Sequence, residues 1–406
     1  MIVGLRCAVC FAEVDIGQPF TWTCPRASTN DPHHLLQFVD DDVDTVLDLA
    51  DDPNPFVRYR GRSAWWAFAR ARGLSDEQSV HLARSIAGEF EITPCEIHDG
   101  LSAAAGITVF AKNETCGVGG SHKARHLAGI MLHLAVAEQV GVLTKRAPLA
   151  ISSCGNAALA AAVVASGQSW PLDVFVPTWM DAAFGDALRD FGVGIHRCER
   201  AGDGDAGDPA MAAFTAAVAN GAIPFSVQGP ANAWCLDTGR SIGWEIEEQL
   251  ATTEAALAPI YVQVGGGALA SSLGRGVGPT HEIRVVQAEG CAPLDRALHS
   301  AERLVDPGRH WSQIMRPWDN PHSLADGILD DETYDWLGIY EVMKLNGGRS
   351  IVASEADIER AYDLVNATGP ATSATGAAGV AGLLSDSDAG RLESGPVVVV
   401  LSGVAR

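Results

Sequence analysis

The sequence predicts an α/β protein with parallel sheets flanked by helices. From about residue 91 onward, short apolar or β-branched runs alternate with helical patterns, which is typical of βαβ units. The clearest strand runs are 149–151, 260–264 and 397–401, and each leads into a turn that contains glycine or serine. The chain has 43 glycines, which suits many tight strand-to-helix turns. Its 406 residues are enough for a large core divided between two lobes.

Composition disfavours several kinds of partner. The chain is 47% hydrophobic and 19% charged, and its net charge is −22. Nucleic acids and anionic membrane surfaces need a basic footprint, so we expect neither as a partner. The longest apolar stretch, near 157–166, is too short to span a bilayer, and no secretory signal pattern is visible. The 9 cysteines, an odd number, fit reduced thiols better than disulfides, so the sequence predicts a cytoplasmic protein.

Residues 1–38 are predicted to form a small extension that resembles a zinc ribbon, with short strands at Leu5 and 20–23. Where the fourth cysteine of such a ribbon would stand, the chain has Ala27. A histidine can take that place, because Zn²⁺ binds imidazole nitrogen as well as thiolate. The candidate metal ligands are Cys7, Cys10, Cys24 and either His33 or His34. The alternatives are a vestigial ribbon without zinc and, for the histidines, a solvated loop pair.

Three further segments favour structural roles. The acidic stretch 40–52 is predicted to be helical around Val43 and Val46, with a solvated face. The aromatic cluster 65–68 is typical of a core or a subunit contact. The polar segment 202–208 has oxygen ligands at a spacing that calcium sites use, but a plain turn is the simpler interpretation.

Lys123 is the first candidate for chemistry. It follows the glycine-rich turn 119–121 and starts an amphipathic helical pattern, so it is expected to be buried early in a helix. Burial lowers the pKa of an amine because desolvation penalises its charged form, and a neutral amine can form a Schiff base with a carbonyl. The alternative is a lysine at a helix start with its head in water.

A second candidate is the turn between the strand 149–151 and the small-residue helix 157–165. In α/β proteins, ligands bind where such a strand ends and a helix opens. The amides of the turn can hold a carboxylate or phosphate, and Asn156 can donate to a phenolate-type oxygen. The turn consists of Ser152, Ser153, Cys154, Gly155 and Asn156. The alternative is a helix cap by Asn or Ser.

Two more strand ends complete the candidate site. The run 260–264 leads into Gly265, Gly266, Gly267, Ala268 and Leu269, where successive glycines let main-chain N–H groups converge on an anion such as phosphate. Taken alone this motif is weak, because many glycine turns bind nothing. The strand 397–401 ends at Ser402, whose hydroxyl can hydrogen-bond a ring nitrogen without protonating it.

In this order, the four motifs resemble the pyridoxal-phosphate enzymes of the tryptophan synthase β-subunit superfamily, called fold type II. Further similarity points to the branch of threonine synthases and threonine/serine dehydratases, and it extends from about residue 53 to the C-terminus. The segments that carry this similarity are Thr93-Pro94, 109–114, 238–246, 286–293, 323–328 and 375–379. Several threonine synthase relatives also carry a cysteine ribbon at the N-terminus.

The resemblance implies a two-lobed enzyme with its cofactor between the lobes. The large lobe would comprise 39–126 and 226–406, and the small lobe 127–225. Pyridoxal 5'-phosphate would form a Schiff base with Lys123, and the other cofactor-binding residues would be Asn156, Gly265, Gly266, Gly267, Ala268, Leu269 and Ser402. The residues expected near the substrate are Ser121, His122, Ser152, Ser153, Cys154 and Gly155. We expect an amino-acid substrate and a homodimer.

The resemblance favours α,β-elimination on a β-hydroxy or β-substituted amino acid, giving a 2-oxo acid and ammonia. A serine opposite the ring, in place of a carboxylate, disfavours transamination and racemisation. Ala124-Arg125 after the lysine favours the dehydratases, whereas the turn 152–156 and the N-terminal cysteines favour the synthases. The alternatives are threonine synthesis from phosphohomoserine, β-replacement, and an inactive cofactor-binding regulatory subunit.

Two residues depart from the family pattern. His122 replaces the usual phenylalanine before the lysine, and a ring that only packs is preferred to an acid that protonates a leaving group. Cys154 replaces a serine, threonine or alanine, and a small buried filler is preferred to a reactive thiol.

Overall fold

The computed structural model describes the whole chain except residues 42–48, 179, 181, 200–207 and 406. Its strands are β1 (Ile2–Cys7), β2 (Glu13–Asp15), β3 (Leu36–Asp40), β4 (Cys95–Ile97), β5 (Val109–Asn113), β6 (Leu149–Ser152), β7 (Leu172–Pro177), β8 (Gly194–Cys198), β9 (Ile223–Pro224), β10 (Ile260–Gln263), β11 (Ile283–Ala288), β12 (Arg349–Ala353) and β13 (Val397–Leu401). Its α-helices are α1 (Pro55–Arg58), α2 (Ala64–Ala71), α3 (Asp76–Ala87), α4 (Asp99–Ala105), α5 (Lys123–Gln139), α6 (Asn156–Gly167), α7 (Ala182–Asp190), α8 (Pro209–Ala219), α9 (Cys235–Gly239), α10 (Ser241–Leu250), α11 (Ala268–Val277), α12 (Pro293–Ala301), α13 (Trp311–Ile314), α14 (Trp336–Asn346), α15 (Glu355–Thr368) and α16 (Ala374–Asp388).

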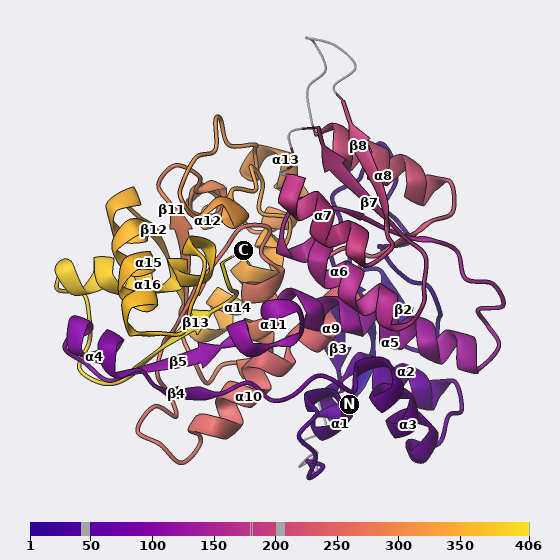
Figure 1. Ribbon diagram of the computed structural model, residues 1–406, viewed down its shortest axis with the longest axis horizontal. Coiled ribbons are helices and arrows are strands. Elements are labelled where there is room, and N and C mark those ends of the chain that lie inside the picture. The colour runs from indigo at the N-terminus through magenta and orange to yellow at the C-terminus, as the bar shows by residue number, and fades with distance from the viewer. Residues whose placement is uncertain (42–48, 179, 181, 200–207, 406) are drawn as a thin grey trace.

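A six-stranded sheet forms the centre of one half of the molecule, in the order β12-β11-β10-β13-β5-β4. Its strands are parallel except for β4, which pairs antiparallel with β5. The sheet is covered by helices, among them α15 and α16 in yellow (Figure 1). Helix α16 lies close to the sheet because it carries glycines on that side: a Cβ on Gly382 would lie 2.4 Å from Val286 Cγ2. The predicted strands 260–264 and 397–401 are confirmed as β10 and β13.

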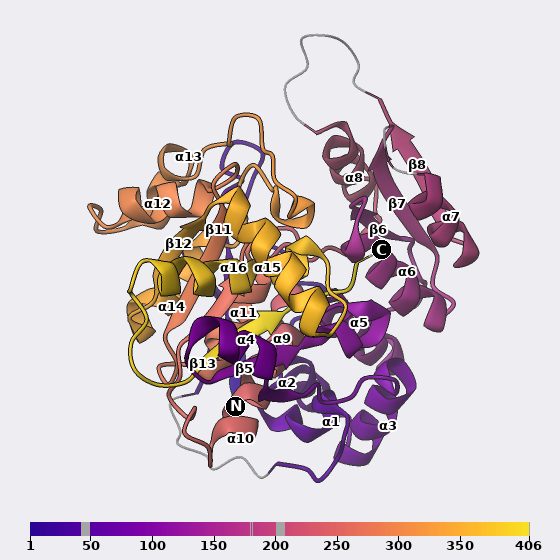
Figure 2. The same ribbon diagram turned by 60° about the vertical axis from the view of Figure 1, so that its left-hand side comes forward.

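A separate four-stranded sheet has the order β8-β7-β6-β9, and all its pairs are parallel. It carries α6, α7 and α8, and in Figure 2 this group stands to one side of the six-stranded sheet. Helix α6 is rich in alanine and buried along most of its length, so it can approach the strands closely. The predicted run 149–151 is confirmed within β6. The lobe boundaries proposed from the sequence stay a prediction.

The N-terminal segment forms a three-stranded antiparallel sheet in the order β2-β1-β3. Leu5 lies in β1 as predicted, but the strand expected at 20–23 is wrong. Phe20 has a φ of 57°, which no strand residue adopts, and its N–H donates to His133 Nε2 of α5 at 3.1 Å. The predicted acidic helix falls mostly on 42–48, and most of the polar segment 202–208 falls on 200–207, both outside the described residues.

Helix α5 is the most deeply buried long helix, and aromatic rings pack around it. From Ala124 to Ala137 every residue is buried. The aromatic cluster 65–68 lies in α2, and the Phe68 ring stacks on His133 of α5 with centroids 4.3 Å apart, which confirms a core role. Among the described helices, none has the length and apolar character needed to cross a membrane.

Candidate active site

Lys123 is the first residue of α5, as the amphipathic pattern predicts. The preceding turn needs glycine, because Gly119 and Gly120 have φ values of 68° and 66°. The lysine side chain is half-buried, and burial lowers the pKa of its amine. The carboxyl groups of Asp330 and Asp335 act in the opposite direction and raise the pKa of Lys123, but the effect of burial is larger. The helix therefore presents an amine that releases its proton more easily than a solvated lysine.

The end of β13 lies directly against the turn before Lys123. Ser121 pairs with Gly403 as an isolated antiparallel bridge, and His122 N donates to Ser402 O at 3.1 Å. A Cβ on Gly403 would lie 3.4 Å from Asn156 Nδ2, so the asparagine amide reaches the same place from α6. Ser121 Oγ is buried and has no hydrogen-bond partner among the described residues. Three predicted site residues, Ser121, Asn156 and Ser402, are thus brought together.

The Ser402 hydroxyl is held in a fixed position. It is 3% exposed, and Gln263 Nε2 at the end of β10 donates a hydrogen bond to its oxygen. Because Ser402 Oγ accepts this bond, its own O–H stays available to donate to a ligand. Sequence reasoning missed Gln263, although its place near the end of the predicted strand 260–264 was a usable signal.

The glycine turn after β10 has a shape that only glycine permits. Gly267 has a φ of 99°, and a Cβ on Gly265 would lie 2.6 Å from Asp330 Oδ2 and 2.9 Å from Ile328 Cα. The Asp330 carboxyl group lies beside this turn, and the main-chain N–H of Gly266 lowers the pKa of Asp330 against the larger opposing effect of burial, so the turn favours an anionic oxygen. Ala268 and Leu269 follow as the buried start of α11.

An acidic segment, residues 330–335, lies over the glycine turn and faces Lys123. Burial raises the pKa of Asp330, and burial raises the pKa of Asp335 to about 7. Asp335 is fully buried; its Oδ2 accepts from Gly229 N at 3.1 Å, while its Oδ1 has no partner among the described residues. Sequence reasoning missed both aspartates, because an acidic run ordinarily indicates a solvated face.

The turn 152–156 lies between β6 and α6 as predicted. Gly155 is the residue before the helix, and no side chain caps it, so the capping alternative is wrong. Within the turn, Gly155 N donates to Ser153 Oγ at 3.3 Å. Cys154 is exposed, which corrects the expectation of a buried filler. Desolvation of the sulfur raises the pKa of this thiol, and the negative charges of Asp208 and Asp326 raise it further. The thiol form is therefore favoured over the reactive thiolate.

His122 has the packing role that the sequence favoured. It is buried, its Nδ1 lies 3.1 Å from Ser402 O, and its ring packs edge-on against His126. Burial lowers its pKa well below the usual range, and the positive charge of Lys123 lowers it further. The ring is therefore neutral at physiological pH, and its one N–H, at Nδ1, is donated to Ser402 O and not to a leaving group.

A buried ion network supports the start of α5. Arg125 Nε donates to Glu114 Oε2 at 2.8 Å, and Arg125 Nη1 donates to Glu245 Oε1 at 2.6 Å. Lys112 pairs with the other Glu245 oxygen, and both side chains are fully buried. Arg125 Nη2 also donates to Thr93 Oγ1 at 3.1 Å, so three segments that carried the family resemblance hold Arg125, two residues after the candidate catalytic lysine.

The candidate metal ligands are brought together at the N-terminus. One ligand atom from each of Cys7, Cys10, Cys24 and His34 lies within 4.8 Å of the others. His33 is outside this group: its ring stacks on Trp311 with centroids 5.6 Å apart. Adjacent residues of the extended chain point to opposite sides, so only one of the two histidines can face the cysteines.

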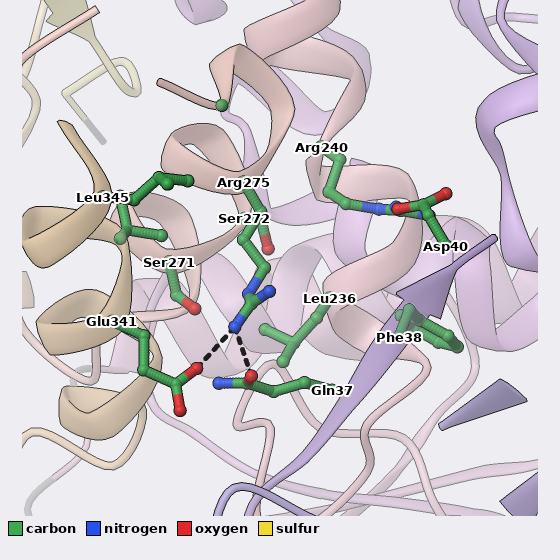
Figure 3. Close-up of a pocket in the computed structure, with 12 residues that line it drawn as sticks. Gln37, Phe38, Asp40, Leu236, Arg240, Ser271, Ser272, Arg275, Glu341 and Leu345 are labelled. Carbon is green, nitrogen blue, oxygen red and sulfur yellow. Dashed lines mark hydrogen bonds and ion pairs between the residues drawn. The ribbon is translucent and has the colours of Figure 1, made fainter. Parts of the chain in front are cut away.

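A pocket elsewhere on α11 lies away from these chemical groups (Figure 3). It is bounded by β3, α9, α11 and α14, and Arg275 there donates to Gln37 and Glu341. None of the predicted cofactor or substrate residues lines it. Both of its arginines are already paired, Arg275 as above and Arg240 with Asp237, and the pocket shares no lining residue with the site around Lys123.

Comparison with known proteins gives a family and a fold. A family model described as "Pyridoxal-phosphate dependent enzyme" matches residues 86–403. Serine racemase from maize is a similar solved structure, with 19% identity, a TM-score of 0.64, and coverage of 80% of this chain and 92% of that one. Threonine deaminase isoform 2 from Solanum lycopersicum has 19% identity and a TM-score of 0.63, covering 82% of this chain and 86% of that one. Diaminopropionate ammonia lyase from Escherichia coli has 16% identity and a TM-score of 0.61, covering 80% and 88%. No curated protein matches the sequence.

Proposed function

Because this chain belongs to the pyridoxal-phosphate dependent enzyme family, we propose that it catalyses α,β-elimination on a β-hydroxy or β-substituted amino acid. The products are a 2-oxo acid and ammonia. The observation that carries this proposal is the buried Ser402 hydroxyl at the end of β13, which Gln263 orients. A carboxylate at this position would favour transamination or racemisation instead.

The residues present fit the cofactor. Lys123 offers a half-buried amine, and the turn 265–269 offers main-chain amides that favour an anionic oxygen. Asn156 would donate to the phenolic oxygen, and Ser402 would donate to the ring nitrogen. When bound, pyridoxal phosphate supplies an electron sink for the charge left at the substrate Cα.

The side chains around the cofactor would have different roles in the reaction. Lys123, with its lowered pKa, takes the proton from Cα as a neutral amine. Ser121, whose hydroxyl lacks a partner among the described residues, and the turn 152–155 bind the substrate carboxylate. His122 keeps the Ser402 backbone in place and transfers no proton, because its ring is neutral and its Nδ1–H is hydrogen-bonded to Ser402 O.

The acidic segment 330–335 supports a lyase over a threonine synthase. A phosphohomoserine substrate would bring a second phosphate near Asp330 and Asp335, and these carboxyl groups repel a phosphate wherever they are ionised, an effect that their raised pKa values weaken. A neutral or cationic β-substituent has no such cost. Threonine synthesis stays the second candidate, because the turn 152–156 and the N-terminal cysteines favour it. β-Replacement and an inactive cofactor-binding subunit are the remaining alternatives.

A product screen tests the proposal. The cofactor-loaded protein is incubated with serine, threonine, aryl-serines, diaminopropionate and phosphohomoserine, and 2-oxo acid, ammonia and phosphate are measured. We expect oxo acid and ammonia in equal amounts from at least one β-substituted amino acid. Lys123→Ala should lose this activity, whereas Lys145→Ala, a change at an exposed lysine, should keep it. Phosphate release from phosphohomoserine without any oxo acid would replace the proposal by threonine synthesis, and bound cofactor without turnover would favour the inactive subunit.

A further inference from the structure

The N-terminal extension brings together three cysteines and one histidine at a single point. Cys7 Sγ lies 3.3 Å from His34 Nδ1, and Cys10 Sγ lies 3.5 Å from Cys24 Sγ. In a tetrahedral site with Zn–S bonds of about 2.3 Å and Zn–N bonds of about 2.0 Å, ligand atoms are about 3.5–3.8 Å apart. We propose that Cys7, Cys10, Cys24 and His34 bind one structural Zn²⁺ ion.

The main chain around the sulfurs is arranged for thiolates. Val9 N and Cys10 N point to Cys7 Sγ at 3.4 and 3.5 Å, and Arg26 N points to Cys24 Sγ at 3.4 Å. Hydrogen bonds from N–H groups favour the charged form of an acceptor, and the thiolate is the form that binds metal. Two separate turns therefore direct main-chain N–H groups at the sulfurs, the arrangement that stabilises a metal-bound thiolate.

A carboxylate lies near the far nitrogen of the histidine, the side from which a second partner usually orients a metal-bound imidazole. His34 is 4% exposed, and its Nε2 lies 3.2 Å from Asp31 Oδ2, without a well-aligned hydrogen bond, while its Nδ1 faces Cys7. A carboxylate on the far nitrogen sets the tautomer and directs the other nitrogen to the metal. The sequence left His33 and His34 as equals, and this geometry assigns His34.

The ligand set selects zinc and a structural role. Three thiolates and one imidazole in a tetrahedron suit Zn²⁺, whereas oxygen ligands would suit calcium or magnesium. All four positions are filled by protein, as in structural sites, so no position is left for a substrate. A Cys10–Cys24 disulfide is the competing state, but their sulfurs stand 3.5 Å apart and a disulfide needs about 2.05 Å.

The site fastens the extension to the helix that carries Lys123. Between Cys10 and Cys24, the chain bonds to the rest of the protein through main-chain groups of 20–22 rather than through a strand. The bonds are Phe20 N to His133 Nε2 at 3.1 Å, Trp234 Nε1 to Thr21 O at 3.1 Å, and Ala233 N to Trp22 O at 2.8 Å. His133 belongs to α5, and Trp234 directly precedes α9. A metal that joins both ends of this segment lowers the entropy lost when it docks.

Metal analysis of the full chain, purified under reducing conditions with zinc supplied, tests the proposal independently of the enzyme's activity. We expect one zinc per chain by mass spectrometry, and cobalt in its place should give the visible bands of a tetrahedral thiolate site. Cys24→Ser should lose the metal and melt at a lower temperature. Cys198→Ser and His33→Ala, which change a distant cysteine and the neighbouring histidine, should keep one zinc.

A second variant covers the case in which Cys24→Ser does not fold. His34→Cys should keep one metal and strengthen the sulfur-to-cobalt absorption, because a fourth thiolate replaces imidazole. A wild-type chain without metal, a Cys10–Cys24 disulfide in its place, or unchanged cobalt bands in His34→Cys would overturn the proposal.

Discussion

Lys112 and Glu245 form an ion pair in which both side chains are fully shielded from solvent. This pair makes Lys112 chemically different from Lys123, the lysine that follows the glycine-rich turn. The Lys112 amine is used up by hydrogen bonds to the buried Glu245 carboxylate and to Thr93 O, whereas Lys123 has a pKa that burial lowers. Only the second amine is free for covalent chemistry.

Borohydride treatment of the cofactor-loaded protein should therefore label one peptide, the one that contains Lys123. Reduction makes the bond between amine and cofactor permanent, so peptide mapping by mass spectrometry reads its position. Label on the peptide of Lys112 or of the exposed Lys145 would contradict the assignment.

Gly266→Asp should abolish cofactor retention. A Cβ at this position would lie 3.1 Å from Tyr334 Cδ2, and the added carboxylate would face the phosphate seat. The bound cofactor is measured by absorbance after gel filtration. Gly167→Asp, at an exposed glycine with open space around it, is the control and should retain the cofactor.

Asp330→Asn should tighten cofactor binding several-fold. The Asp330 carboxyl group lies beside Gly266, where a Cβ would be 3.5 Å from Asp330 Oδ2, so removing its charge removes a competitor for the main-chain amide that the phosphate would use. Titration of cofactor-free protein by fluorescence measures the affinity. Asp331→Asn, at the exposed neighbouring residue, is the matched control and should leave the affinity unchanged. An equal gain in cofactor affinity in Asp331→Asn would show a general charge effect instead of competition for the Gly266 amide.

Ser402→Asp should keep the cofactor but slow elimination relative to exchange of the Cα proton. A carboxylate can protonate the ring nitrogen, which a hydroxyl cannot, and a charged ring holds the carbanion longer. Proton exchange in D₂O and oxo-acid release are followed on the same sample. Ser402→Thr preserves the hydroxyl and should keep the wild-type ratio; an unchanged ratio in Ser402→Asp would refute the role of a neutral ring.

Asp335 should make the cofactor-free protein less stable as pH rises. Burial raises the pKa of Asp335 to about 7, above its value of 3.8 in the unfolded chain. At a pH between these two pKa values, the folded state therefore binds a proton that the unfolded state has released. Stability is full below about pH 4 and falls up to about pH 7, by at most about 4 kcal/mol at ~1.4 kcal/mol per pKa unit.

Asp335→Asn removes this titration and should raise the free energy of unfolding at pH 8 but not at pH 4.5, as measured by urea denaturation. The amide oxygen can still accept from Gly229 N. A gain of the same size at both pH values would show that the carboxyl does not titrate in this range.

Most strands and helices around the site, and its main chemical groups, could be predicted from local sequence patterns. Lys123 at a helix start, the glycine turn after β10 and Ser402 after β13 are local patterns, and in a parallel sheet the carboxyl ends of strands meet at one edge. Local patterns of this kind need no knowledge of distant contacts, which is why the fold class and the family were predictable.

Which groups face one another depends on long-range contacts that the sequence pattern does not reveal. The aspartates at 330 and 335 resemble a solvated acidic run until the loop is placed over the glycine turn, and burial then changes their pKa values. The exposure of Cys154 and the selection of His34 over His33 depend in the same way on which side of the chain faces the protein. These properties arise from contacts between residues far apart in the sequence, and local spacing carries no record of such contacts.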